Sequence, residues 1–232
     1  MGKKQSTAFP APSPPERPDG SDGSKRWEFA EHDLVMDEVI RGVDLSATAI
    51  GFLRFVRCEL RDLRLTGAQL QALELVDVLL VDCELSGSNL HAVSMQRVAL
   101  RNCRMTGVVL SDAELAHVRL VDCKVDDANL RFTKFDTVCA ESSSFVRADL
   151  YQAQLRAVSF DHCDLTEADL SKVVIDGAKH AGLRLTGSTV ESLHGAAGLQ
   201  GTTISVDQLV PFALSVFAES GISVELEPDP QS

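Results

Sequence analysis

Residues 71–90 read QALELVDVLLVDCELSGSNL, in which leucine recurs at positions 75, 80, 85 and 90. The interval of five extends from Ile40 to Val190, and two residues, Ala140 and His180, interrupt the row of large apolar side chains. Steps of five would scatter such a row around a helix and alternate it between the two faces of a strand. The side chains of this row can all be buried in one core only if the chain turns a corner after each pentapeptide. Four corners close one coil, so the sequence predicts an all-β fold, a right-handed quadrilateral parallel β-helix with four pentapeptides in each coil.

A second row of residues supports the coil. Small or compact apolar residues stand two positions before most members of the first row, as at Ala68, Val78 and Cys83. We expect these side chains to point inward, where a small group fits beside the large central one.

The same register divides the 232 residues into three parts. Residues 1–26 hold five of the eight prolines and predict a disordered, proline-rich tail. Residues 27–200 form the β-helix, and its N-terminal cap is predicted from Trp27, Phe29, Leu34 and Val35. Residues 201–232 are predicted to form a C-terminal helix and an acidic tail.

Composition and charge limit the function. The chain has a net charge of −12, and a nucleic-acid site needs clustered Lys and Arg, so direct contact with nucleic acid is not expected. No run of 18 apolar residues is present, and no charged-then-apolar export signal opens the chain, so a membrane partner is not expected either. These observations favour a cytoplasmic protein.

A helix is predicted where the period of five ends, near residue 201. It begins at Ser205 and Gln208, which have the spacing of a capping box, and it ends between Glu219 and Gly221. Pro211 could kink it. A helix that is apolar on most sides is usually buried on more than one of them. We therefore expect one side to cover the last coil and the other to form a homodimer interface. The candidate interface residues are Val206, Leu209, Val210, Phe212, Ala213, Leu214, Val216 and Phe217.

Three pentapeptides carry a resemblance to a known family. They are Ala128-Asn129-Leu130-Arg131-Phe132, Ala148-Asp149-Leu150-Tyr151-Gln152 and Ala168-Asp169-Leu170-Ser171-Lys172. They resemble the A-(D/N)-L-x-x consensus of the pentapeptide-repeat family, and the repeat covers residues 40–190. The terminal helix is similar to the dimerisation element of the fluoroquinolone-resistance members, which resemble B-form DNA and bind DNA gyrase. The resemblance implies a non-enzymatic DNA mimic that binds gyrase or another topoisomerase, and inhibits it or protects it from poisons.

Charge is distributed unevenly along the chain. Residues 111–200 hold 14 acids and nine bases, and residues 201–232 hold five acids and no base, whereas residues 40–110 are close to neutral. A dimer joined at the C-terminal ends would place this acidity at its centre, although no single face of the coil is an acidic stripe. The candidate partner-binding acids are Asp149, Asp161, Asp164, Glu167, Asp169 and Asp176. The alternative is a generic protein-interaction scaffold with a partner unrelated to DNA.

Two columns of residues could carry other chemistry. Cys83, Cys103, Cys123 and Cys163 are spaced by whole coils and stack, and Asp62, Asp82 and Asp122 stack one position earlier. The cysteines face an aliphatic interior, which favours small buried side chains over a metal site. Asp at a corner commonly hydrogen-bonds the backbone of its own turn. No phosphate loop, nucleophile elbow or paired-histidine motif is present. We expect no metal site, no cofactor and no enzyme activity.

Overall fold

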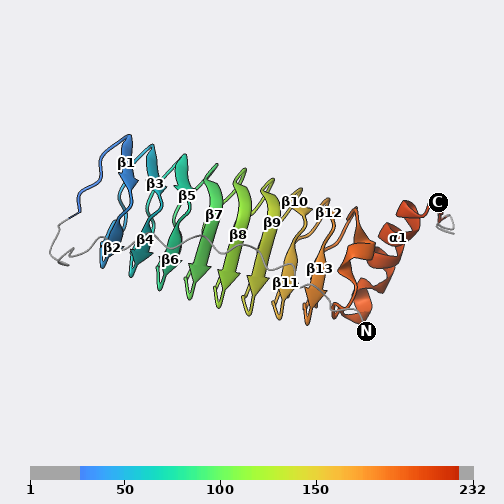
Figure 1. Ribbon diagram of the computed structural model, residues 1–232. Coiled ribbons are helices and arrows are strands. Elements are labelled where there is room, and N and C mark those ends of the chain that lie inside the picture. The colour runs from blue at the N-terminus through green and yellow to red at the C-terminus, as the bar shows by residue number, and fades with distance from the viewer. Residues whose placement is uncertain (1–26, 225–232) are drawn as a thin grey trace, which may run out of the picture.

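The computed structural model describes residues 27–224 and shows a parallel β-solenoid with a helix at its C-terminal end. Figure 1 shows the coils stacked along one axis, with α1 beyond the last of them. The strands are β1 (Asp33–Met36), β2 (Val39–Arg41), β3 (Leu53–Val56), β4 (Glu59–Arg61), β5 (Leu73–Val76), β6 (Leu79–Val81), β7 (Ser94–Arg101), β8 (Glu114–Val121), β9 (Lys134–Glu141), β10 (Gln154–Arg156), β11 (Ser159–Asp161), β12 (Val174–Asp176) and β13 (Lys179–Ala181). The helical elements are η1 (Ala196–Leu199), η2 (Val206–Gln208) and α1 (Leu209–Glu219).

The strands pair in parallel, each residue with the residue four pentapeptides further along the chain. Leu75 pairs with Met95 in the next coil, and Leu115 pairs with Phe135. One ladder passes through β1, β3, β5, β7, β8, β9, β10 and β12, and isolated bridges such as Asn89 to Val109 continue the stacking on the sides without long strands. The predicted quadrilateral β-helix is confirmed.

The corners of the coil are residues in the left-handed backbone conformation, two positions after each central apolar residue. They include Asp62, Asp82 and Asp122, with φ of 53°, 55° and 54°. Asp and Asn adopt this conformation more readily than other L-residues, in which Cβ comes close to a carbonyl oxygen. The aspartate column is therefore explained by backbone geometry.

The rows predicted to be inward form the core. Leu90, Leu130 and Leu150 are fully buried, and Ala68, Val78 and Cys83 of the second row are buried beside such residues. Ala140 pairs in the ladder with Phe160 and lines the same interior space as other phenyl rings, which is compatible with a small side chain at 140.

The N-terminal end of the core is covered by aromatic rings. Trp27 stacks on Phe29 at a centroid distance of 5.7 Å, and Phe29 meets Phe55 edge-on at 5.6 Å. Leu34 does not belong to this cap, contrary to our expectation. It lies in β1, where alternate side chains point outward, and it is 55% exposed, whereas Val35 beside it is buried. The predicted tail, residues 1–26, lies outside the described residues.

The C-terminal helix begins as predicted. Ser205 and Gln208 form the capping box, and the chain passes through η2 into α1. Pro211 is the third residue of α1, in the first turn, where a missing N–H leaves no intrahelical hydrogen bond unmade. Among residues 27–224, no helix is long and apolar enough to cross a bilayer.

Candidate interaction surfaces

The side of α1 that faces the rod is partly polar. The Nε2 amide of Gln208 donates hydrogen bonds to the carbonyl oxygens of Leu185, at 2.7 Å, and Ser188, at 2.6 Å. Ser215 is buried on the same side, and Phe212 packs against the core. The helix is thus fixed to the last coil by buried hydrogen bonds and one large apolar contact.

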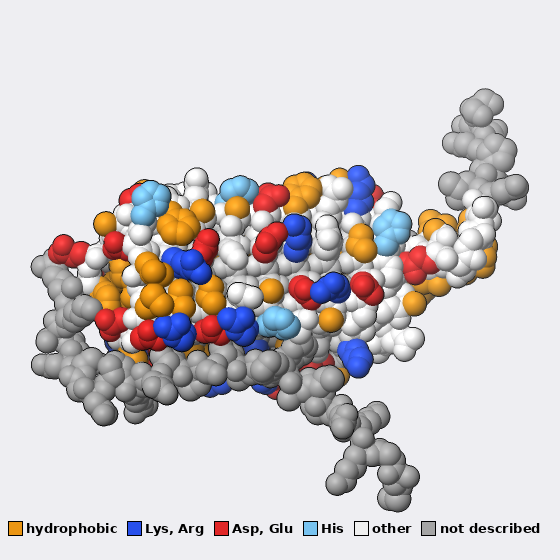
Figure 2. All heavy atoms as spheres, turned by 45° about the horizontal axis from the view of Figure 1, so that its top comes forward, with side chains coloured by type: hydrophobic (Ala, Val, Ile, Leu, Met, Phe, Trp, Pro, Cys, Tyr) orange, Lys and Arg blue, Asp and Glu red, His pale blue; other side chains and the backbone are white. Residues whose placement is uncertain are grey.

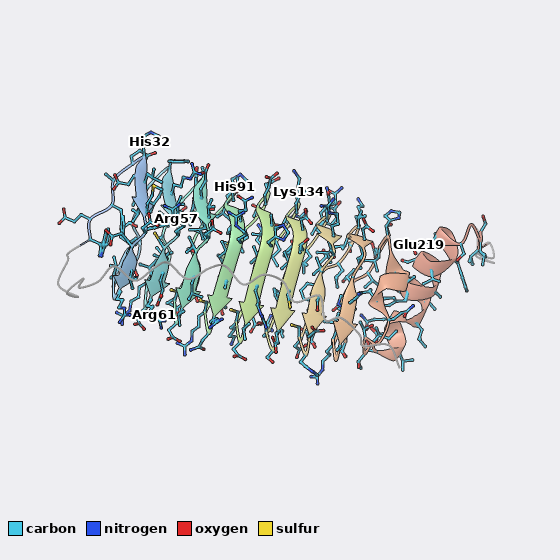
Figure 3. The ribbon with its side chains drawn as sticks, viewed as in Figure 1. His32, Arg57, Arg61, His91, Lys134 and Glu219 are labelled. Atoms are coloured by element: carbon cyan, nitrogen blue, oxygen red, sulfur yellow. The ribbon has the colours of Figure 1, made fainter. Side chains whose placement is uncertain are left out.

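Glu219 fixes the other end of the helix. Its Oε1 accepts hydrogen bonds from the backbone N–H groups of Gly195 and Ala196, the latter at 3.0 Å. Figure 3 shows Glu219 on α1, next to the last coil. A carboxylate that accepts two backbone hydrogen bonds makes a strong link, because hydrogen bonds to charged groups exceed neutral ones in strength.

The outer side of η2 and α1 is apolar and exposed. Val206 is 83% exposed and Val210 67%, and Leu209, Leu214, Val216 and Phe217 are also exposed. Of the eight predicted interface residues, these six point away from the rod, Ala213 is partly buried, and Phe212 is turned toward the core. A surface helix ordinarily buries its apolar face and exposes its polar one. Here six large apolar side chains stay exposed although Phe212 packs on the core, and an exposed apolar patch of this kind suits a partner.

The structure does not gather the six candidate acids into one site. Asp149 and Asp169 are neighbours in one bridge column, and Asp164 lies in another column that joins Ser144 and Arg184. Asp161 ends β11 and Asp176 ends β12, while Glu167 stands at a left-handed corner. The acids are therefore spread around the rod.

Most of these carboxylates already have partners. Asp149 pairs with Arg131 at 2.9 Å and Asp164 with Arg184 at 3.6 Å. Asp161 accepts a hydrogen bond from the N–H of Ala181, at 3.1 Å. Asp169 accepts one from the N–H of Ser171, at 2.9 Å. Two of the six carboxylates are therefore neutralised by an arginine, whereas Asp161 and Asp169 are held by backbone groups and keep their charge.

Many charged side chains on the surface of the rod form ion pairs with a residue of an adjacent coil. Arg57 and Arg147 each bind an aspartate of the preceding coil through both Nε and Nη2, at 2.6–2.8 Å. The bound guanidinium groups lower the pKa of the exposed Asp37 and Asp127 carboxyl groups. Figure 2 shows acidic and basic side chains interleaved on one face of the rod. Such pairs add little stability in water, but they neutralise each other's charge.

The cysteine column lies in the core. Cys83, Cys103 and Cys123 are buried free thiols, and the Sγ atom of each lies 3.4 Å from the carbonyl oxygen two residues earlier. Burial raises the pKa of Cys163 to about 12 and raises that of the partly buried Cys139 as well. Burial of the column among aliphatic side chains favours a packing role for its thiols. No cluster of His, Cys, Asp or Glu within residues 27–224 is arranged to hold a metal ion.

Residues 73–148 and 93–170 match the family described as a pentapeptide repeat region. The solenoid is built of pentapeptide repeats. Three solved structures are similar to this chain. HetL, a pentapeptide repeat protein involved in heterocyst differentiation regulation in the cyanobacterium Nostoc sp., is 18% identical over 75% of this chain and 88% of its own, with a TM-score of 0.45. A trypsin-treated form of QnrB1, a plasmid-mediated fluoroquinolone resistance protein, is 18% identical over 84% of this chain and 98% of its own, with a TM-score of 0.36.

A pentapeptide repeat protein of the Arabidopsis thaliana thylakoid lumen is 22% identical over 48% of this chain and 64% of its own, with a TM-score of 0.25. No curated protein matches the sequence. At these identities the likeness concerns the fold alone.

The pentapeptide register also brings together four residues that our sequence reasoning missed as a site. Arg131, Phe132, Tyr151 and Lys172 occupy outward positions in three successive coils, and the Arg131 guanidinium lies 4.4 Å from the centroid of the Tyr151 ring. The sequence could have indicated this cluster. Arg131, Tyr151 and Ser171 are spaced by 20 residues and so hold equivalent positions in successive coils, and Lys172 follows Ser171.

Proposed function

We propose that this pentapeptide-repeat protein is a non-enzymatic binding protein in which two copies join through the exposed side of α1 to form a double-length rod. The observation that carries the proposal is the apolar surface left exposed on η2 and α1, where Val206, Val210 and Phe217 are exposed while Gln208 and Ser215 are buried. A second copy offers the same apolar patch, and a two-fold interface is self-complementary by symmetry. The family supports a binding role, since its members are generally structural or interaction proteins.

DNA gyrase or a related topoisomerase is the partner we propose to test first. Residues 111–232 hold 19 acids and nine bases, so the dimer would carry its negative charge near the centre of the rod. The ion pairs described above reduce this charge, and a partner would have to recognise the acids that remain, such as Glu167 and Asp176. The rod would then occupy the DNA-binding surface of the enzyme and inhibit it or protect it from poisons. A protein-interaction scaffold with another partner is the alternative.

The dimer is tested by light scattering coupled to size-exclusion chromatography. The unaltered protein is expected to have twice the mass of one chain, and the Val210→Asp and Phe217→Asp variants the mass of one chain, because a buried unpaired carboxylate is unfavourable. Leu34→Asp is the matched control, since Leu34 is an exposed apolar residue at the other end of the rod. A monomeric unaltered protein, or a Phe217→Asp variant that stays dimeric, would contradict the proposed interface.

The partner is tested in a supercoiling assay with purified DNA gyrase and micromolar protein. Inhibition, or restored supercoiling in the presence of a fluoroquinolone, is expected for the unaltered protein and reduced for the Phe217→Asp variant. If supercoiling does not change under either condition, gyrase is not the partner, and the scaffold hypothesis remains.

A further inference from the structure

An ordered cluster of aromatic and cationic side chains lies on the surface of the C-terminal half of the rod. The Phe132 and Tyr151 rings meet edge-on at a centroid distance of 6.1 Å. The Arg131 guanidinium lies 5.6 Å from the Phe132 ring and 4.4 Å from the Tyr151 ring. The Lys172 ammonium lies 5.1 Å from the Tyr151 ring and donates a hydrogen bond to its hydroxyl oxygen at 2.8 Å. Each ring thus has a cation against it, an arrangement that attracts through the ring quadrupole.

Phe132 is the member that the fold does not explain. It stands at a left-handed corner with φ of 59°, and the equivalent corners of the next two coils hold Gln152 at 56° and Lys172 at 57°. Its ring is also 41% exposed. Other corners of the rod use Ala92 and Ala157 at φ of 57° and 50°, so an aromatic ring is not needed to turn the chain. An exposed large apolar side chain that the corner does not require is available to a partner.

The cluster is fixed in place before any partner arrives. Asp149 holds Arg131 at 2.9 Å, and it also accepts a hydrogen bond from the backbone N–H of Tyr151 at 3.0 Å. The positive charge of Arg131 is thereby balanced and its plane is held over the ring. Groups that are ordered in advance lose little conformational entropy on binding. Tyr and Arg are among the residues that dominate binding energy at protein interfaces, and Phe is enriched there.

Lys172 gives the cluster its unbalanced charge. Within residues 27–224 most bases pair with a carboxylate of an adjacent coil, as Lys134 does with Glu114 at 2.9 Å. Lys172 has no carboxylate within ion-pair distance in that part of the chain, and its ammonium contacts the Tyr151 hydroxyl instead. The group that complements this cation, beside an exposed phenyl ring, is a carboxylate that stands next to an apolar side chain.

We propose that Phe132, Tyr151 and Lys172, positioned by Arg131, form a docking site for a partner protein's segment that presents an acidic residue beside an aromatic or aliphatic one. The partner's carboxylate binds the Lys172 ammonium, and its apolar side chain packs on the Phe132 ring. The site rests on the proposed role of the rod as a binding protein. In this proposal the partner binds one compact cluster of side chains rather than the acidic residues spread around the rod.

The site can be tested without knowing the natural partner. A phage-displayed library of random short peptides is selected on the unaltered protein, and the selected peptides are then titrated by fluorescence anisotropy. We expect selected sequences that carry Asp or Glu within two positions of an aromatic or aliphatic residue. Phe132→Ala and Lys172→Gln should weaken their binding by roughly tenfold or more, as for interface hot spots. Lys179→Gln, which alters an exposed lysine on β13, is the matched control and should bind as tightly as the unaltered protein.

Three results would overturn the site: no selected peptide, selected peptides without the acidic and apolar pair, or equal binding to the Phe132→Ala variant. Thermal unfolding separates docking from packing. Because alanine is already found at corners of this rod, Phe132→Ala should leave Tm unchanged or raise it, whereas a lower Tm with unchanged peptide binding would assign Phe132 a structural role. The dimer and the supercoiling assay are independent of this selection, so peptide binding by a monomeric protein would reject the double-length rod and keep the docking site.

Discussion

Replacing Gly195 by alanine tests how α1 is held on the end of the rod. Gly195 has φ of 82°, and a Cβ atom built on it would lie 2.1 Å from the carbonyl oxygen of Ile175. An ordinary contact between carbon and oxygen is about 3.3 Å, so the backbone would have to move by about 1 Å. The same N–H that would move donates a hydrogen bond to Glu219. The substitution therefore disturbs the last coil and the helix together.

The expected loss can be assembled from three contributions. A left-handed alanine costs about 1–2 kcal/mol. Forcing an extra carbon into a filled space costs about 1–3 kcal/mol. Loss of a hydrogen bond to the Glu219 carboxylate costs about 1.5–3 kcal/mol. Because these contributions overlap, we expect roughly 3–6 kcal/mol of destabilisation, confined to the last coil and α1.

Amide hydrogen exchange measures this loss locally. The N–H of Ile175 donates to the carbonyl oxygen of His194 at 2.8 Å, so it reports on the last coil, and its exchange should accelerate by at least about 100-fold. Exchange in β8 should not change. Gly107→Ala is the control, because Gly107 has φ of 67° and nothing within 4 Å of a built Cβ, and its cost should not exceed the roughly 1–2 kcal/mol of a left-handed alanine. Equal effects of the two substitutions would refute the argument that the contact with Ile175 holds the end of the rod.

Three further substitutions test the core, a corner and the buried histidine. Leu130 is 1% exposed, so Leu130→Ala should lower the free energy of unfolding in urea by roughly 2–5 kcal/mol, and a loss below about 1 kcal/mol would contradict its place in the core. Thr137 is β-branched at φ of 61°, so Thr137→Asn should raise Tm through a gain of about 0.5–1 kcal/mol, and a lower Tm would contradict the strain. Burial lowers the pKa of His180, whose Nδ1 accepts the N–H of Phe160 at 3.3 Å. The unfolded chain therefore binds the proton more readily, and the stability present above the unfolded pKa of about 6.5 is lost as the pH falls through the folded pKa. His180→Leu should remove the decrease in Tm between pH 7.5 and pH 5. If the decrease persists in this variant, a group other than His180 causes it.

The pentapeptide register was enough to place each side chain inside or outside the rod, because parallel in-register stacking repeats the same environment in every coil. Leu34 shows the limit of residue type as a guide, since it is apolar but stands at an outward position of β1. The positions of the acids around the rod also followed from the register. Their neutralisation by arginines of the next coil did not, because it depends on how long side chains orient in space. The hydrogen bond from the Gly195 N–H to Glu219 could not be predicted either, because it is a tertiary contact between the end of a helix and a turn of the last coil.

The constant offset between coils also determines how such a rod can change in length. Each coil contacts the coils on either side of it, as Leu115 contacts Met95 and Phe135 in the ladder. Removing or duplicating one whole coil would keep every surface column in line and alter the length by one strand spacing, about 4.8 Å. Removing a single pentapeptide between Phe132 and α1 would instead turn everything beyond the cut by a quarter of the coil, and the direction of α1 relative to Phe132 would change. The distance between two surface sites can thus be adjusted by in-frame deletion or duplication of the coding sequence for one coil, while their relative direction stays the same.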